Sequence, residues 1–224
     1  MRTSIWFVRA GQSVANQQRK FQGTLDSPLT PLGIAQSEMA ALQLRRQRIV
    51  AIYCAPQTAS VQTARCLASV CMAPPIEEDA WSDQALGVLT GLTRAAAVRA
   101  YPLAMAMRLR DPVYGCAEGG ESLAGVAQRC IAAWHGLIQR HQGQRIVVVT
   151  QAAPIQIILS AIAGIPLTHT WSWRVDNGSV TGIDTYGTTH IIRCVNATTQ
   201  LTRKEIGLAN RHIPHSAITN PSGT

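Results

Sequence analysis

Short unbroken runs of apolar residues alternate along the chain with longer stretches in which apolar positions recur every three or four residues. The unbroken runs cover residues 5–8, 49–54 and 145–150, and their lack of polar alternation is typical of strands buried on both faces. The periodic stretches cover residues 30–48, 57–71, 121–141 and 153–163, and they predict helices. Two further strands, 179–186 and 190–195, are expected to form a hairpin-like pair through Gly187. This order predicts an α/β fold, a three-layer α/β/α sandwich with a mostly parallel central sheet and late antiparallel strands.

Local signals place the ends and the buried faces of several helices. Thr30 followed by Pro31 is typical of an N-cap and the first helical residue, and Gly164 is expected to end the last helix. The apolar face of the first long helix is predicted from Leu32, Ala35, Met39 and Leu42. A single stripe is predicted for the helix after Ser122, formed by Leu123, Val126, Cys130, Trp134 and Leu137. Residues 73–75 are expected to form a turn.

Between Trp81 and Glu121 the pattern weakens. Residues 94–109 indicate one or two short helices between glycine-containing loops, so we interpret about 88–120 as an insertion that covers the functional site as a lid. The alternative is a helical insertion with no role in the site. The length suits one domain over residues 1–201, followed by a polar tail over 202–224.

The net charge of +8 comes from 20 basic and 12 acidic residues, and the basic residues are scattered along the chain. Scattered charge does not predict a nucleic-acid surface. The six cysteines show no spacing typical of a metal site, and no stretch is long and apolar enough to span a membrane. Since no signal peptide is evident either, we expect a cytoplasmic protein without metal or cofactor. The expected partner is a small-molecule ligand, and binding to nucleic acid or to a membrane is not expected. Whether the protein forms a homodimer is left open.

Several separated motifs carry a family resemblance. They are Val8-Arg9-Ala10-Gly11-Gln12-Ser13 with Asn16, the segment from Gln22 to Thr30, Cys54-Ala55-Pro56 with Gln62-Thr63-Ala64, Gly120-Glu121-Ser122-Leu123, Val149-Thr150 before Ala153-Pro154, and Arg174 to Val180. In this order they resemble the histidine phosphatase (phosphoglycerate mutase-like) superfamily over nearly the whole chain to about Leu201. The resemblance implies the same α/β fold, with the site where the first strand ends.

The resemblance also assigns positions to the superfamily's phosphohistidine chemistry. The nucleophilic histidine falls on Ala10, the second histidine on Gln151 and the second arginine on Ala59. Arg9 and Asn16 match retained phosphate contacts, and Asp83 takes the place of the acid. Gln22 and Ala152 complete the expected ligand-binding set. None of the six histidines falls at a catalytic position, and three changes together favour natural divergence over one inactivating substitution.

These replacements remove charge as well as the nucleophile. With Arg9 facing Asp83, the site is expected to be nearly neutral, and a dianionic phosphoryl group would lose about a few kcal/mol for each missing charge-assisted contact. Conventional phosphatase or mutase activity is therefore not expected. The first hypothesis is a repurposed enzyme that binds a neutral or monoanionic organic molecule, with Asp83 as acid or base.

Two other functions stay open. One is a non-catalytic pseudophosphatase that acts as a binding or regulatory module, in which the side chains replacing the histidines fill the site. The other is a residual phosphatase with an unorthodox nucleophile, for which Cys54 is the candidate. The fold alone does not choose among the three.

Overall fold

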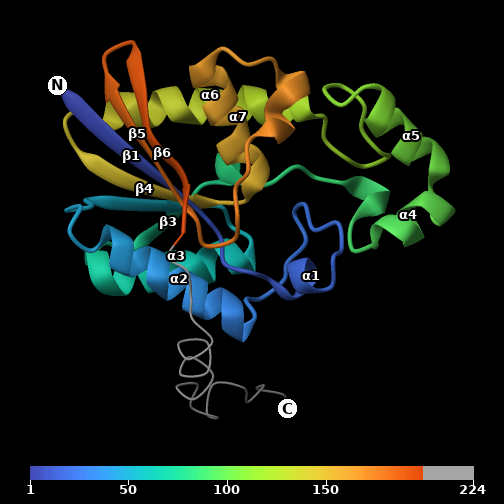
Figure 1. The fold of residues 1–224 in the computed structure, drawn as a ribbon, viewed down its shortest axis with the longest axis horizontal. Helices are drawn as coiled ribbons and strands as arrows, with labels where there is room; N and C mark the ends of the chain where they lie inside the picture. Colours follow the sequence, from blue (N-terminus) through green and yellow to red (C-terminus); the bar gives the residue numbers. More distant parts are fainter. Residues whose placement is uncertain (199–224) are drawn as a thin grey trace, which may run out of the picture.

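A mixed six-stranded sheet, in the order β3-β2-β4-β1-β5-β6, runs through the computed structural model, which describes residues 1–198 (Figure 1). The strands are β1 (Arg2–Arg9), β2 (Ala51–Cys54), β3 (Pro75–Glu77), β4 (Arg145–Thr150), β5 (Val180–Tyr186) and β6 (Thr189–Ala197). The helices are α1 (Val14–Gln17), α2 (Pro31–Leu44), α3 (Thr58–Cys71), α4 (Arg94–Ala100), α5 (Pro102–Arg110), α6 (Leu123–Arg140) and α7 (Ala152–Ala163), with short 3-10 turns η1 (Asp79–Trp81), η2 (Gly87–Leu89) and η3 (Leu167–Ser172). The predicted tail 202–224 and the predicted domain end at 201 lie outside the described residues.

β1 is the central strand on which the sheet changes direction. It pairs in parallel with β4 and antiparallel with β5, while β2 is parallel to both β3 and β4. Val147, Val148 and Val149 of β4 are completely buried, as the unbroken apolar run predicts. The α/β fold with its mostly parallel sheet and late antiparallel pair is confirmed. The turn expected at 73–75 is wrong in part, because Pro75 begins the edge strand β3, where a missing backbone N–H is tolerated.

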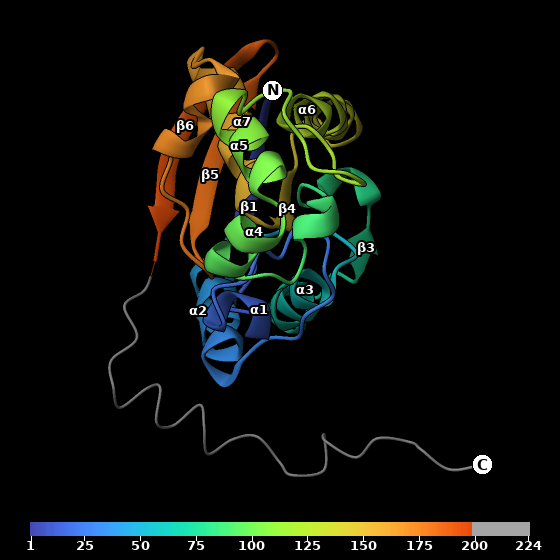
Figure 2. The same ribbon diagram turned by 90° about the vertical axis from the view of Figure 1, so that its right-hand side faces the viewer.

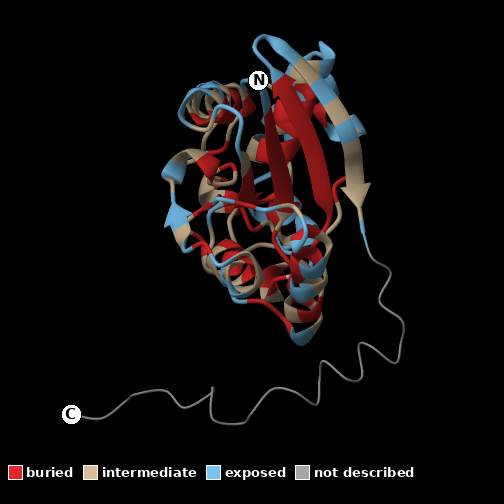
Figure 3. Cartoon of the chain, turned by 90° about the vertical axis from the view of Figure 1, so that its left-hand side faces the viewer, coloured by how far each residue is buried: buried red, intermediate tan, exposed pale blue. Residues whose placement is uncertain are grey.

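Helices cover both faces of the sheet. α2 and α3 lie against one face, and α6 and α7 lie against the other (Figures 1 and 2). The larger core lies on the α6–α7 face, where Phe7 packs between Trp81 and Trp134 at ring-centroid distances of 5.6 and 5.9 Å. The strands at the centre of the molecule are buried along most of their length (Figure 3).

The expected helix ends are confirmed where a capping residue marks them. Thr30 accepts a hydrogen bond from the Gly33 amide at the start of α2, and Gly164 ends α7 in the left-handed conformation. The predicted stripe of α6 is buried at all five positions. The predicted face of α2 is wrong in part: Ala35 is buried as expected, but Leu42 is 46% exposed and the buried side chains are mainly small ones.

Small residues on α2 allow the backbone to approach the loop after β1. A Cβ atom added to Gly11 would lie 2.1 Å from the Gly33 carbonyl oxygen, and one added to Gly33 would lie 2.1 Å from the Gln12 carbonyl oxygen. Neither position has room for any side chain. The loop that follows β1 is therefore locked against the first turn of α2.

The segment expected to form a lid contains α4 and α5. These helices share a small apolar cluster of their own, formed by Leu86, Leu89, Ala97, Met105 and Ala117. They lie on the side of the molecule where β1 ends and α1 follows (Figure 1). No helix within residues 1–198 has the length and apolar character needed to cross a membrane.

Candidate functional site

The ends of β1 and β4 lie side by side, because Arg9 is in register with Thr150. Beyond them the loop before β5 closes over the end of β1. The Gly178 amide donates to the Arg9 carbonyl at 2.9 Å, and the Asn177 amide group donates to the Ala10 carbonyl at 3.0 Å. Three chain segments that are distant in sequence therefore fix the backbone at the site. This is the sheet edge at which α/β proteins place ligands.

Arg9 extends from this edge with much of its guanidinium buried. Its Nη1 donates to the Val175 carbonyl at 2.6 Å, whereas its Nε is buried and has no partner within residues 1–198. Burial lowers the pKa of Arg9, and the nearby carboxylates of Asp83 and Asp176 oppose that shift. The guanidinium remains a cation with an unused donor.

Asn16 of the short helix α1 and Gln22, in the loop after it, share one hydrogen-bond network. Asn16 donates to the Gln22 Oε1 at 2.9 Å, Ser13 donates to the same oxygen at 2.6 Å, and Asn177 donates to the Asn16 Oδ1 at 3.1 Å. These bonds fix the orientation of the Gln22 amide. Its Nε2 is buried and has no partner among the described residues. Sequence reasoning placed Asn16 and Gln22 in the site, and the structure joins them in one network with the loop over β1.

Gln151 follows β4 and occupies the N-cap position of α7, although its side chain forms no capping bond. The side chain is only 3% exposed, and its Nε2 has no partner within the described chain. We call the three unused donor atoms, Arg9 Nε, Gln22 Nε2 and Gln151 Nε2, the donor rim. Ala152, the first residue of α7, packs against the larger core.

The positions of Ala10 and Ala59 are apolar and closed. Both side chains are 0% exposed, and they form a cluster with Leu29, against which Ile34 packs. We call these four residues the apolar floor. Both alanines were expected among the ligand-binding residues, but neither offers exposed surface to a ligand.

Asp83 lies in the loop after η1. Its Oδ1 accepts a hydrogen bond from the Gln84 amide at 2.9 Å. Burial raises the pKa of Asp83 from 3.8 to about 6, although that hydrogen bond and the positive charges of Arg9 and Arg129 oppose the shift. Asp83 and Arg9 influence each other through space, but they form no ion pair within 4 Å among the described contacts. A carboxyl group titrating near pH 6 can both donate and accept a proton.

Arg129 of α6 fixes the loop that carries Asp83, and sequence reasoning missed it. Its guanidinium donates to the carbonyl oxygens of Ala80, Ser82 and Asp83 at 2.9, 2.7 and 3.0 Å. It also donates twice to the Glu121 carboxylate, at 2.9 Å each. A guanidinium has five N–H donors in a fixed fork, and this geometry is specific to arginine. Nothing in the spacing of the sequence indicates this contact.

Arg108 of α5 is a second residue that sequence reasoning missed. Its Nη2 donates to the Gln84 Oε1 at 3.2 Å, and its Nη1 is buried without a partner in the described part of the chain. Burial lowers the pKa of Arg108, while Asp83 is among the groups that raise it. The α4–α5 segment therefore brings a second cation to the side of the site that holds Asp83. Arg108 adds to the pair of Arg9 and Asp83 from which a nearly neutral site was expected.

Other candidate groups are not available for chemistry here. Cys54 is 0% exposed, and burial, followed by the nearby Glu77, raises the pKa of its thiol to about 12. Among residues 1–198, no three His, Cys, Asp or Glu side chains are grouped to hold a metal ion. Of the histidines, His135 lies on α6, His141 caps it, His169 lies on η3 and His190 lies on β6, while His212 and His215 lie outside the described residues.

The fold is that of an α/β protein with a mixed six-stranded sheet, and its candidate site lies where β1 and β4 end. Residues 5–198 match the model of the histidine phosphatase superfamily (branch 1), and the chain belongs to this superfamily. Phosphoserine phosphatase 1 of Hydrogenobacter thermophilus is 29% identical over 194 residues, which cover 87% of this chain and 92% of that protein.

Solved structures agree with this assignment. YhfR of Bacillus stearothermophilus superposes with a TM-score of 0.82 at 25% identity, covering 91% of this chain and 99% of that one. The alpha-ribazole phosphatase of Shigella flexneri has a TM-score of 0.82 at 21% identity, covering 90% and 100%. The second similarity concerns the fold alone.

Proposed function

We propose that this member of the superfamily has lost the phosphohistidine chemistry and binds a small organic molecule at the donor rim, which it transforms by proton transfer to or from Asp83 without phosphoryl transfer. In this proposal Ala10 and Gln151 occupy the positions of the two catalytic histidines, and Ala59 occupies that of an arginine. The ligand is neutral or monoanionic, and the second cation, Arg108, favours the monoanion.

The donor rim is the observation that carries the proposal. Its three nitrogen atoms belong to different segments, and each is buried without a partner within residues 1–198. A buried donor left unpaired costs about 1–3 kcal/mol, so native proteins rarely keep several together without a use for them. A carboxylate, carbonyl or hydroxyl of a ligand supplies the missing acceptors.

The balance of charge limits the ligand class. Glu121 neutralises Arg129 and Arg174 neutralises Asp176, each pair at 2.9 Å, which leaves Arg9 and Arg108 against Asp83. With Asp83 ionised the net charge is one positive unit. This matches one carboxylate, whereas a phosphoryl dianion would retain excess negative charge in a buried setting.

The nucleophile needed for phosphoryl transfer is missing from this arrangement. Ala10 has only a methyl group, and the Cys54 thiol stays protonated at neutral pH because its pKa is raised to about 12. These facts weigh against the residual phosphatase with an unorthodox nucleophile. Asp83, titrating near pH 6, is the group best suited to exchange a proton with a ligand held by Arg9 and Arg108, and in its ionised form it accepts the proton.

The second candidate function is a binding module without chemistry. It is favoured by the closed apolar floor, since Ala10 and Ala59 leave no exposed surface at the deepest part of the site. Under both proposals the ligand is bound by the same residues, and only the enzyme converts it to a product.

The first experiment tests the loss of phosphoryl transfer. We expect para-nitrophenyl phosphate hydrolysis by the wild-type protein to equal the rate without protein. The Cys54→Ala variant serves as a control for the cysteine. Hydrolysis by the wild type that exceeds the background and co-purifies with the folded protein would overturn the proposal.

The second experiment separates the enzyme from the binding module. A mixture of cellular metabolites is incubated with the wild type and with Asp83→Asn, and the species consumed are identified by mass spectrometry. We expect a monoanionic compound that only the wild type consumes and that both proteins bind. Equal consumption by both proteins would exclude Asp83 as the proton donor, and no consumption by either would favour the binding module.

A further inference from the structure

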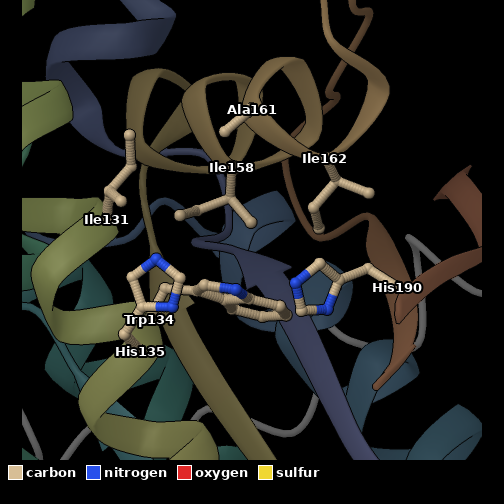
Figure 4. A pocket seen from close by; sticks show the side chains of 7 residues that line it. All are labelled: Ile131, Trp134, His135, Ile158, Ala161, Ile162 and His190. Carbon is tan, nitrogen blue, oxygen red and sulfur yellow. The ribbon is translucent and has the colours of Figure 1, made fainter. Parts of the chain in front are cut away.

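A pocket lies between α6, α7 and β6, away from the candidate site. It has a volume of about 120 Å³ and is lined by Ile131, Trp134, His135, Ile158, Ala161, Ile162 and His190. The imidazoles of His135 and His190 flank the Trp134 indole, beneath the side chains of α7 (Figure 4). The pocket is therefore lined by two imidazole groups, and its other lining side chains are apolar.

The residues that line this pocket range from buried to exposed. Trp134 and Ile158 are 3% and 1% exposed, whereas His135 and Ala161 are exposed, so the pocket reaches solvent between α6 and α7. His190 is half-buried and packs edge-on against Trp134 at 5.6 Å between ring centroids. Its Nδ1 is buried and has no partner within the described residues.

This pocket and the candidate site lie toward opposite ends of the sheet. His190 pairs with Thr185, and Thr185 pairs with Thr3 near the start of β1. Arg9, at the other end of β1, is six residues further on, or roughly 20 Å away at the usual rise of a strand. A ligand in this pocket does not touch the donor rim.

We propose that this pocket binds a monocarboxylate with a single aromatic or comparably sized apolar ring, whose ring packs on Trp134 and the isoleucines while its carboxylate accepts hydrogen bonds from His135 and His190. The proposal does not depend on the function of the donor rim. An apolar cavity of roughly 150 Å³ accommodates a benzene ring, which is close to the size of this pocket. The two imidazoles supply the polar specificity that an apolar pocket needs.

The charges around His190 agree with an anionic ligand. Burial lowers the pKa of His190, and the neighbouring His135 lowers it further. α7 carries no charged side chain, and Asp184 and Arg193 lie on the other face of the sheet, beside Ser4 and Trp6. No carboxylate of these packed elements competes for the His190 imidazole, so a bound carboxylate favours its protonation.

Benzoate is the probe for this proposal. We expect it to shift the imidazole resonances of His135 and His190 and the indole resonance of Trp134 in an NMR titration. Binding should become about tenfold tighter from pH 8 to pH 6, because the His190 imidazole takes up a proton beside the bound carboxylate, while a carboxylic acid stays ionised above about pH 5. Benzyl alcohol, which has the same ring without the charge, should bind more weakly and without this pH dependence.

Substitutions inside and outside the pocket test whether benzoate binds there. His190→Gln should weaken benzoate at least tenfold, and Ala161→Phe, which fills the mouth of the pocket from an exposed position, should abolish it. His169→Gln and Ala163→Phe, at exposed positions of η3 and α7 outside the pocket, should leave binding unchanged.

Three results would overturn the proposal. They are no detectable benzoate binding at about 10 mM, equal affinity in Ala161→Phe and the wild type, and benzoate shifts at Arg9 and Gln151 with none at His190. The last result would assign the benzoate to the donor rim, and the function proposed for that site would stand.

Discussion

The apolar floor and the donor rim are neighbours in the same site, yet they differ in how their buried atoms are paired. The floor of Ala10, Leu29, Ile34 and Ala59 buries only apolar side chains. The rim keeps three buried nitrogen donors unpaired within the described residues. The difference teaches that the floor contributes stability, while the rim offers the unpaired donors that the proposed ligand would use. Changes to the two regions should therefore affect different measurements.

The largest effect is expected where charge is forced into the floor. Ala59→Arg places a long cation at a position with 0% exposure, and we expect it to lower the free energy of unfolding by about 3–5 kcal/mol. Urea unfolding measures this loss, with Ser69→Arg at an exposed position of α3 as the control. If Ala59→Arg left the urea midpoint of unfolding unchanged, the arginine side chain would have reached solvent and the floor would not be closed.

Breaking the support of the Asp83 loop should have the next largest effect. Arg129→Met removes two bonds to Glu121 and leaves three backbone carbonyls without their donor, so we expect a loss of about 2–4 kcal/mol. Arg140→Met removes a pair with Glu78 in which the arginine side chain is 50% exposed, and should cost under about 1 kcal/mol. Similar losses in both variants, measured by urea unfolding, would contradict this ranking.

Removing the buried carboxylate should stabilise the protein. The pKa of Asp83 is raised from 3.8 to about 6, so the folded state binds this proton more tightly than the unfolded state. Stability therefore falls as the pH rises through that window, and the ionised form remains unfavourable above it. Asp83→Asn should raise the free energy of unfolding by about 2 kcal/mol at pH 8 and change it little below pH 4. A gain that is independent of pH would show that burial of the charge is not its cause.

The smallest effect on stability is expected at the lid. Arg108→Gln should change the free energy of unfolding by no more than about 0.5 kcal/mol, because Arg108 makes one bond, to Gln84. It should nevertheless abolish the rise in melting temperature that a monocarboxylate such as lactate produces through the rim. Arg110→Gln, at an exposed position of the same helix, is the control. An undiminished lactate shift in Arg108→Gln would remove Arg108 from the site.

Much of the fold could be predicted because its signals are local. β4 and the stripe of α6 were predictable from their apolar patterns, and Thr30 and Gly164 mark helix ends by their own chemistry. The buried face of α2 could not be predicted in this way. Its packing is set by a close backbone approach at Gly33, which favours small side chains over the apolar ones that the pattern emphasises.

The residues of the candidate site also divide into those that local sequence signals predict and those that only the tertiary structure reveals. Arg9, Asn16, Gln22 and Gln151 follow strand ends or short motifs, and the structure brings their side chains to one edge of the sheet. Arg108 is one of several arginines in a weakly patterned insertion, and only the folding of α5 toward Gln84 distinguishes it. The order of the sequence contains no information on that contact.

The contact between Gly11 and Gly33 limits how this protein can diverge. Since neither residue has room for a side chain, the loop after β1 cannot shift to fit a new ligand without separating from α2. New ligand preferences must then arise from side-chain changes at the rim or from the α4–α5 insertion, which has a separate apolar cluster. We expect variants selected for altered ligand binding to gather in those two places and to spare both glycines.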